Sequence, residues 1–175
     1  MKLLTGFPVL ALLLFCSAMI SGSEVAYFSL APEDIEKLKI SKSRRSAHVL
    51  QLLKLPDRLL STILVVNNVV NVAIVILAAY LSTRLFNFHE YPLLGFILEV
   101  VAITFLLLFF GEILPKVYAT KNHLRVALFM SNPLILLEKI FRPVASLLIR
   151  STSVVKKRAL FRHKNISMTD LSDAL

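Results

Sequence analysis

One stretch constrains this chain most, because three asparagines lie there inside a long apolar run. The run extends from Leu59 to Leu81, which is long enough to cross a bilayer as a helix. Amides in hydrocarbon need partners for their N–H and C=O groups. Asn67 and Asn68 lie four and three residues before Asn71, so all three are predicted to crowd toward one side of the helix. Such groups usually face a helix bundle, a water-filled cavity or a bound ion.

Two more apolar runs of spanning length accompany this one. The 175 residues are 57% hydrophobic, and the mean hydropathy is +0.74, which is unusual for a soluble domain. The sequence predicts spans at about 8–31, 58–83 and 92–115. The expected fold class is therefore an all-α integral membrane protein, with three transmembrane helices that contain broken segments and with juxtamembrane amphipathic helices.

The net charge of +9 is concentrated in two parts of the chain, before the second span and after the third. The loop between these spans carries a single basic residue, Arg84. The positive-inside rule therefore predicts an N-terminus outside and a C-terminus in the cytoplasm, in a multi-pass protein of the cell (inner) membrane. We interpret the basic excess as topology and contact with the anionic lipid bilayer, and expect no nucleic-acid partner.

The N-terminal segment allows a second interpretation. Lys2, an apolar run and then Cys16 resemble a lipoprotein signal, although Phe15 is bulky for such a cleavage site. Ordinary signal cleavage near Ser17 is another alternative. Cys16 is the sole cysteine and cannot form an internal disulfide.

A polar step interrupts the first apolar run at Ser21, Gly22, Ser23 and Glu24. Such a step is expected to weaken a membrane helix. The alternative is that the helix ends there and that Ser21 or Ser23 caps the next one.

The third run ends in a similar way. Gly111 and Pro115 flank Glu112, a pattern that predicts a helix broken around a carboxylate. The alternative is a helix terminus at the interface, with Glu112 in a salt bridge to Lys116.

Segments outside the spans alternate apolar and basic residues. We expect juxtamembrane amphipathic helices within 33–54 and 121–155. Residues 1–155 would form the transmembrane domain. Residues 156–175 are more polar and are expected to form a linker and the start of a cytoplasmic domain that is not present here.

The three polar clusters are predicted to lie at one depth. Mid-depth is about ten helical residues from either boundary. Asn67 follows Arg58 by nine residues, Ser23 precedes Glu33 by ten, and Glu112 precedes Lys121 by nine.

The donors there are hydroxyls, carboxamides, a carboxylate and backbone carbonyls at Gly22 and Gly111, which suit a hard cation such as Mg²⁺ or Na⁺. No nucleophile–base pair or phosphate loop is evident, so we expect no enzyme.

At these residues the sequence resembles the transmembrane domain of the CorB/CorC and cyclin M (CNNM) magnesium transporters, a hemolysin-C-like family. The resemblance covers roughly 10–155. One departure is Val66, where the family often has glycine. The matching pieces are Ser21–Ala26, Leu55–Leu64, Asn67–Asn71 and Gly111–Lys116.

The resemblance implies a homodimer whose inward-facing cavity binds Mg²⁺, with export coupled to Na⁺. It also implies ATP binding, but through a cystathionine-β-synthase (CBS) domain that these residues do not include. By motif match, the ligands would be Ser23, Asn67, Asn71 and Glu112, with backbone at Gly22 and Gly111 nearby. Asn68 and Ser21 complete the candidate metal site.

A function of a different class is the alternative. The chain would then be a non-transporting membrane scaffold or regulator, for example of a motility or secretion complex, that keeps a structural ion.

Overall fold

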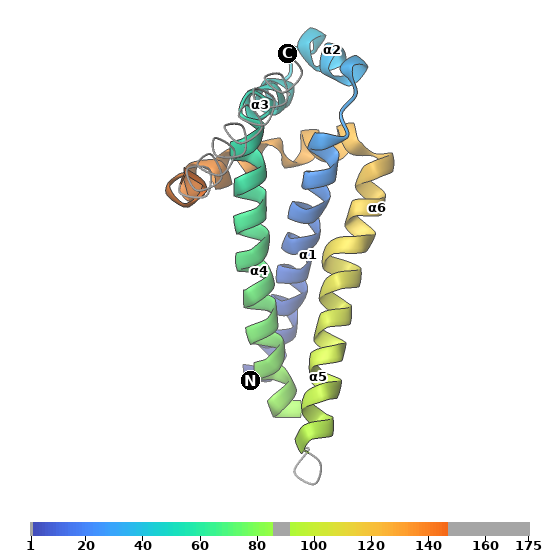
Figure 1. The fold of residues 1–175 in the computed structure, drawn as a ribbon, viewed down its shortest axis with the longest axis vertical. Helices are drawn as coiled ribbons and strands as arrows, with labels where there is room; N and C mark the ends of the chain where they lie inside the picture. The colour runs from blue at the N-terminus through green and yellow to red at the C-terminus, as the bar shows by residue number, and fades with distance from the viewer. Residues whose placement is uncertain (1, 86–91, 147–175) are drawn as a thin grey trace, which may run out of the picture.

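The computed structural model describes residues 2–85 and 92–146, and it confirms the predicted fold class. Three helices are long and apolar enough to cross a membrane, over Thr5–Phe28, Pro56–Arg84 and Leu93–Lys121. The first is α1 (Lys2–Phe28) and the second is α4 (Pro56–Leu85). They stand side by side with the third span in Figure 1. The first helix begins before residue 8 and ends at Phe28, before the predicted end at 31. The second helix extends two residues past the predicted span at each end, and the third continues past 115 to Lys121.

The third span stays helical but changes its winding. It consists of α5 (Pro92–Leu106), the π-helix η1 (Leu107–Ile113) and α6 (Leu114–Lys121). The N–H of Leu114 donates to the carbonyl of Phe109, five residues back. Pro115 has no N–H with which to bond the carbonyl of Gly111, which weakens the α-helical pattern here. The break expected around Glu112 is therefore a wider helical turn, not an interruption.

The predicted weakness in α1 is not seen. This helix runs unbroken through Ser21–Glu24, so the alternative in which it ends there and a serine caps the next helix is wrong. The hydroxyl of Ser23 donates to the carbonyls of Met19 and Ile20, at 2.7 and 2.9 Å. Serine thus satisfies its own polar group inside the helix and does not need a helix end.

Two juxtamembrane helices fill most of the 33–54 segment. They are α2 (Pro32–Ile40) and α3 (Arg44–Leu53). Asp34 accepts a hydrogen bond from the N–H of Ala31 at 3.2 Å, which fixes the start of α2. Ser43 caps α3 by accepting from the N–H of Arg45.

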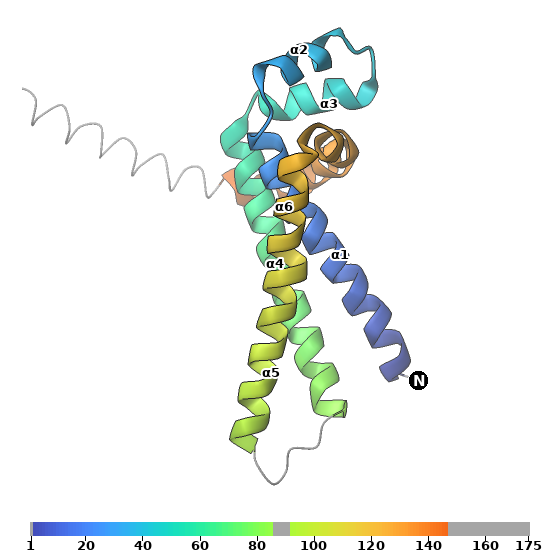
Figure 2. The same ribbon diagram turned by 90° about the vertical axis from the view of Figure 1, so that its right-hand side faces the viewer.

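A further helix covers 123–146 and lies across the same end of the spans as α2 and α3 (Figures 1 and 2). We call this the basic end, because residues 32–54 and helix 123–146 carry nine of the fourteen described lysines and arginines. The predicted helical residues 147–155 and the predicted linker 156–175 lie outside the described residues.

The hydrophobic core gathers toward the basic end. Leu52 of α3, Leu59 of α4 and Leu134 of helix 123–146 are each at most 2% exposed and belong to one cluster. The buried Tyr27 hydroxyl of α1 donates to the carbonyl of Ala127 at 3.1 Å. The spans are therefore held to the juxtamembrane helices by a shared core.

Candidate metal centre

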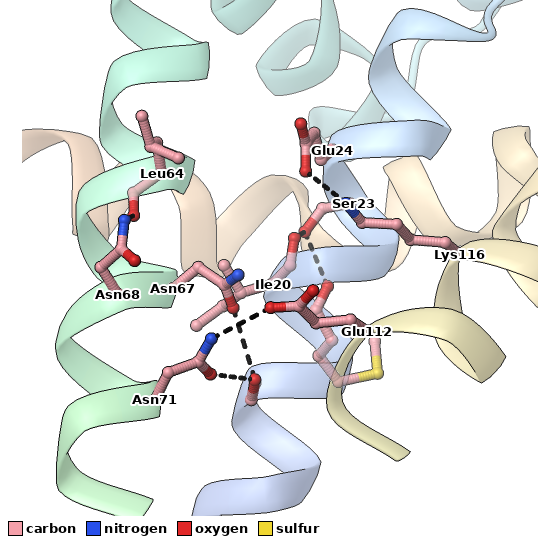
Figure 3. A network of polar contacts seen from close by, with 11 residues as sticks. Ile20, Ser23, Glu24, Leu64, Asn67, Asn68, Asn71, Glu112 and Lys116 are labelled. Atoms are coloured by element: carbon pink, nitrogen blue, oxygen red, sulfur yellow. Dashed lines mark hydrogen bonds and ion pairs between the residues drawn. The ribbon is translucent and has the colours of Figure 1, made fainter. Parts of the chain in front are cut away.

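A hydrogen-bonded network joins all three spans near the π-helix. The Asn71 amide nitrogen donates to a carboxylate oxygen of Glu112 at 3.2 Å. The Ser17 hydroxyl lies 2.7 Å from the amide oxygen of Asn71 and 3.3 Å from that of Asn67. Figure 3 shows Asn67, Asn71 and Glu112 converging from α4 and η1. Asn71 therefore meets the carboxylate directly, whereas Asn67 joins the network through Ser17.

Asn68 is not part of this network. Its amide nitrogen donates to the carbonyl of Leu64 at 2.9 Å, and its side chain is exposed. In Figure 3 it points away from Asn67 and Asn71. The expectation that all three amides share one side of the helix is wrong for Asn68, because one residue turns a helix by about 100°.

The predicted serines lie nearer the basic end than the network does. Ser21 and Ser23 are fully buried in α1. Ser23 uses its proton on the backbone, so its oxygen lone pairs remain free to accept or to coordinate. The Ser21 oxygen has no hydrogen-bond partner among the described residues, and neither has that of Thr62 on α4. A buried hydroxyl without a partner is unusual, and each of these two oxygens is available to coordinate an ion.

The two predicted glycines allow close approach between helices. A Cβ at Gly22 would lie 3.3 Å from the carbonyl oxygen of Pro115. A Cβ at Gly111 would lie 3.1 Å from the Ser17 hydroxyl oxygen. Small residues at such contacts let backbones pack closely in membranes. Both glycines therefore allow α1 to pack closely against the third span, with Ser17 beside Gly111 and Gly22 beside Pro115.

The alternative salt bridge between Glu112 and Lys116 is not formed in the described part of the chain. Lys116 pairs with Glu24 of α1 at 3.1 Å. This pair lies on the basic-end side of the network (Figure 3). It lines a hollow of about 370 Å³ together with Val25, Phe28, Ser29 and Leu60. The Glu112 carboxylate therefore accepts a hydrogen bond from Asn71 and is not paired with Lys116.

The sequence-based site missed Ser17. This side chain is fully buried and supplies the contact of α1 to both amides. Ser17 lies one helical turn before Ser21, and that spacing is the available signal. The signal is weak, because a serine inside a helix can bond to its own backbone and then needs no partner.

The donor set is rich in oxygen. Hydrogen bonds connect one carboxylate, two amide oxygens and one serine hydroxyl. Hard cations such as Mg²⁺ and Na⁺ prefer oxygen ligands, whereas zinc and copper prefer nitrogen or sulfur. A bound cation would need the Asn71 amide to exchange its present contacts, since its oxygen accepts from Ser17. The oxygen-rich donor set fits a hard cation better than zinc or copper.

Three curated relatives are similar to this chain over most of its length. The chain is 35% identical over 144 residues to a "UPF0053 protein" of Haemophilus influenzae, covering 82% of this chain and 33% of that one. It is 30% identical over 141 residues to the "UPF0053 inner membrane protein YfjD" of Escherichia coli, covering 81% and 32%. It is 34% identical over 125 residues to "Metal transporter cnnm-4" of Caenorhabditis elegans, covering 69% and 26%.

The chain spans about a third or less of the length of these relatives. A family model described as "Cyclin M transmembrane N-terminal domain" matches residues 8–173, which is nearly the whole sequence. The match includes nearly all of the first span, the whole of the other two, and the polar network. The three-span membrane chain therefore belongs to the family of cyclin M transmembrane N-terminal domains.

Proposed function

We propose that this chain is an ion-transport domain, not an enzyme, that binds Mg²⁺ within the membrane and exports it from the cytoplasm, coupled to Na⁺. The observation that supports it most is the contact from Ser17 through Asn71 to Glu112, because it joins three spans through oxygen-bearing groups. A relative named as a metal transporter supports the same class of function. ATP would act through a CBS-type domain outside this chain.

Each residue has a proposed role. Glu112 supplies the negative charge that offsets desolvation of a divalent ion. Asn67, Asn71 and Ser23 supply neutral oxygens, with Ser21 and the backbone at Gly22 and Gly111 nearby. The geometry adds Ser17 to this set and gives no support to Asn68. Mg²⁺ gives up water reluctantly, so several ligands would be water.

The proposed orientation follows from the basic end. The N-terminus lies toward the opposite end of the spans from α2 and α3 (Figure 1). The positive-inside rule then places the basic end in the cytoplasm and the N-terminus outside. A cysteine introduced at Ser43 should resist a membrane-impermeant thiol reagent in intact cells, in a Cys16→Ser background. Labelling of that cysteine from outside would reverse the assignment.

We also propose a homodimer in the bilayer. The third span exposes many large apolar side chains, among them Phe96, Val101 and Phe105. Lipid or a second copy can cover such a face, and the family resemblance favours a two-fold pair. Crosslinking in native membranes should give a dimer. Monomer alone, under conditions that crosslink a known dimer, would contradict this.

The site is tested by replacing its carboxylate. Glu112→Gln keeps the shape and one oxygen but removes the charge. Because 1.4 kcal/mol corresponds to tenfold in affinity, we expect Mg²⁺ binding weaker by at least about tenfold in calorimetric titration. Asn71→Ala should weaken binding less, since it removes a neutral oxygen.

Glu99→Gln is the matched control for the charge change. It lies on the same span, thirteen residues before Glu112, or about 20 Å along the helix. It should leave Mg²⁺ affinity unchanged. Unaltered affinity in a folded Glu112→Gln protein would remove the site assignment.

Transport is separated from the scaffold alternative by flux. Proteoliposomes containing the full-length protein should move Mg²⁺, and a Na⁺ gradient should change the rate. Glu112→Gln should abolish the flux. Intact Mg²⁺ binding with no flux would instead favour a scaffold that keeps an ion for structure.

A further inference from the structure

A second hollow lies at the basic end, away from the polar network. It has a volume of about 370 Å³ and is lined by Arg45, Leu124, Arg125, Leu128 and Phe129. Arg45 belongs to α3, and the other four belong to helix 123–146. The hollow is therefore lined by two arginines that are eighty residues apart in sequence.

The two helices that form this hollow are tied together beside it. His48 of α3 and Asn132 of helix 123–146 share a hydrogen bond of 2.7 Å. Arg45 lies one turn before His48, and Leu128 one turn before Asn132. The hollow thus lies about one helical turn from a fixed contact, so its two sides are held in place.

Neither arginine is neutralised by the protein in the described part of the chain. Both side chains are exposed, and the ion pairs found there involve other basic residues. An arginine fork binds phosphate oxygens well, and two of them facing one hollow favour a phosphate group.

The surface next to the hollow is apolar. Phe129 is 58% exposed and lies one turn after Arg125. Leu136, Ile140 and Val144 continue the same exposed stripe along helix 123–146. A helix with an exposed apolar stripe and basic residues beside it lies in a membrane interface. Phosphate and acyl chain would therefore meet Arg125 and Phe129, respectively.

We propose that this hollow binds the phosphate headgroup of an anionic phospholipid, with an acyl chain against Phe129. Basic pockets at the ends of transmembrane helices are suited to such headgroups. A bound lipid would bridge α3 and helix 123–146, which pack on the spans that carry the polar network. The site is independent of which ion the network binds.

Native mass spectrometry of the full-length protein in neutral detergent tests the proposal. Phosphatidylglycerol and phosphatidylcholine are added in equal amounts, and the wild type should retain phosphatidylglycerol selectively. Arg45→Gln with Arg125→Gln should reduce the retained phosphatidylglycerol at least fivefold. The matched control is Arg44→Gln with Lys121→Gln, which removes the same charge nearby but outside the hollow.

The control pair distinguishes binding in the hollow from general electrostatic attraction of the lipid to the basic surface. Retention close to wild type in the control, with loss in the test pair, supports the proposal. Equal loss in both pairs, or no loss in either, overturns it. Size-exclusion profiles confirm that each variant is folded, and Arg45→Lys with Arg125→Lys provides a second variant that keeps the charge and should lose less lipid.

A free phosphate is distinguished from a lipid by a soluble probe. Phosphatidylglycerol should raise the thermal unfolding midpoint in detergent, whereas glycerol 3-phosphate at the same concentration should not. Phe129→Ala should reduce the shift caused by phosphatidylglycerol. A shift of the same size with glycerol 3-phosphate, unaffected by Phe129→Ala, would show a soluble-phosphate site and overturn the lipid proposal.

Discussion

At the basic end, α1 packs against α6 and helix 123–146 through buried side chains, whereas at the opposite end α5 lies away from α1 (Figure 2). An apolar hollow of about 380 Å³ opens there, lined by residues that include Phe7, Leu81, Glu99 and Ile103. The polar network lies between these two regions. Hollows of about 370 Å³ also lie toward the basic end, so the two regions differ in how their helices pack and not in empty volume. We expect the buried core of the basic end to fix the geometry of the site, and the opposite end to rearrange more readily.

The largest expected difference comes from truncating equally buried leucines in the two regions. Leu52 and Leu81 are each 2% exposed. Leu52→Ala should destabilise by about 2–5 kcal/mol, because its neighbours at the basic end cannot close the cavity. Leu81→Ala should cost below about 2 kcal/mol, because that side chain already borders a hollow. Thermal and denaturant unfolding in detergent measure both, and equal losses would refute the comparison.

A smaller difference is expected at two glycines. A Cβ at Gly22 would press on the carbonyl oxygen of Pro115 at 3.3 Å, and backbone cannot move aside. Gly22→Val should therefore cost about 1–3 kcal/mol through overpacking. At Gly6, a Cβ would meet the methyl end of Leu81, which can rotate.

Gly6→Ala is thus expected to be neutral or stabilising, by up to about 1 kcal/mol from helix propensity. Both variants are compared by unfolding midpoint. If Gly6→Ala destabilised as much as Gly22→Val, the opposite end would be as rigid as the basic end.

The free energy of unfolding should depend on pH through Asp34, which lies at the basic end. Asp34 accepts from the Ala31 N–H and lies 2.9 Å from Nε2 of His123. The backbone N–H of Ala31, followed by His123, lowers the pKa of the Asp34 carboxyl below its ordinary value of 3.8. Because the folded pKa is lowered, the stabilisation is fully present above pH 3.8 and is lost as the pH falls through the folded pKa.

Asp34→Asn removes this charge and mimics the protonated carboxyl. The wild type should be more stable than Asp34→Asn near neutral pH, and the two unfolding midpoints should converge below pH 3.8. A difference between them that stayed constant over the whole pH range would exclude the charge as its source.

The smallest effect is expected at Thr62. Its hydroxyl oxygen is buried without a partner among the described residues. Thr62→Val removes an unsatisfied polar group at almost constant shape, so stability should be unchanged or slightly higher. Ser17→Ala is the contrasting change, since it removes hydrogen bonds to Asn67 and Asn71 and should cost about 0.6–1.5 kcal/mol. A loss at Thr62 as large as at Ser17 would indicate an unseen partner for the threonine.

The sequence alone determined the membrane fold and the depth at which Asn71 and Glu112 meet. Three apolar runs predicted the three spans, because only helices of that length satisfy their backbone in lipid. Depth counted from Arg58 and Lys121 placed Asn67 and Glu112 at one level, and the network confirms that Asn71 and Glu112 meet. Length and depth follow from the fixed rise of a helix, so they can be counted along the chain.

The tertiary structure alone decided which side chains face inward. It turned Asn68 to the exposed side, brought in Ser17, and kept α1 helical through Ser21–Glu24. It also placed a π-helix where a break was expected around Glu112. The physical reason is rotation: one residue turns a helix by about 100°, so the inward face depends on how the neighbouring helices cross and pack. Here the close contacts at Gly22 and Gly111 set that packing.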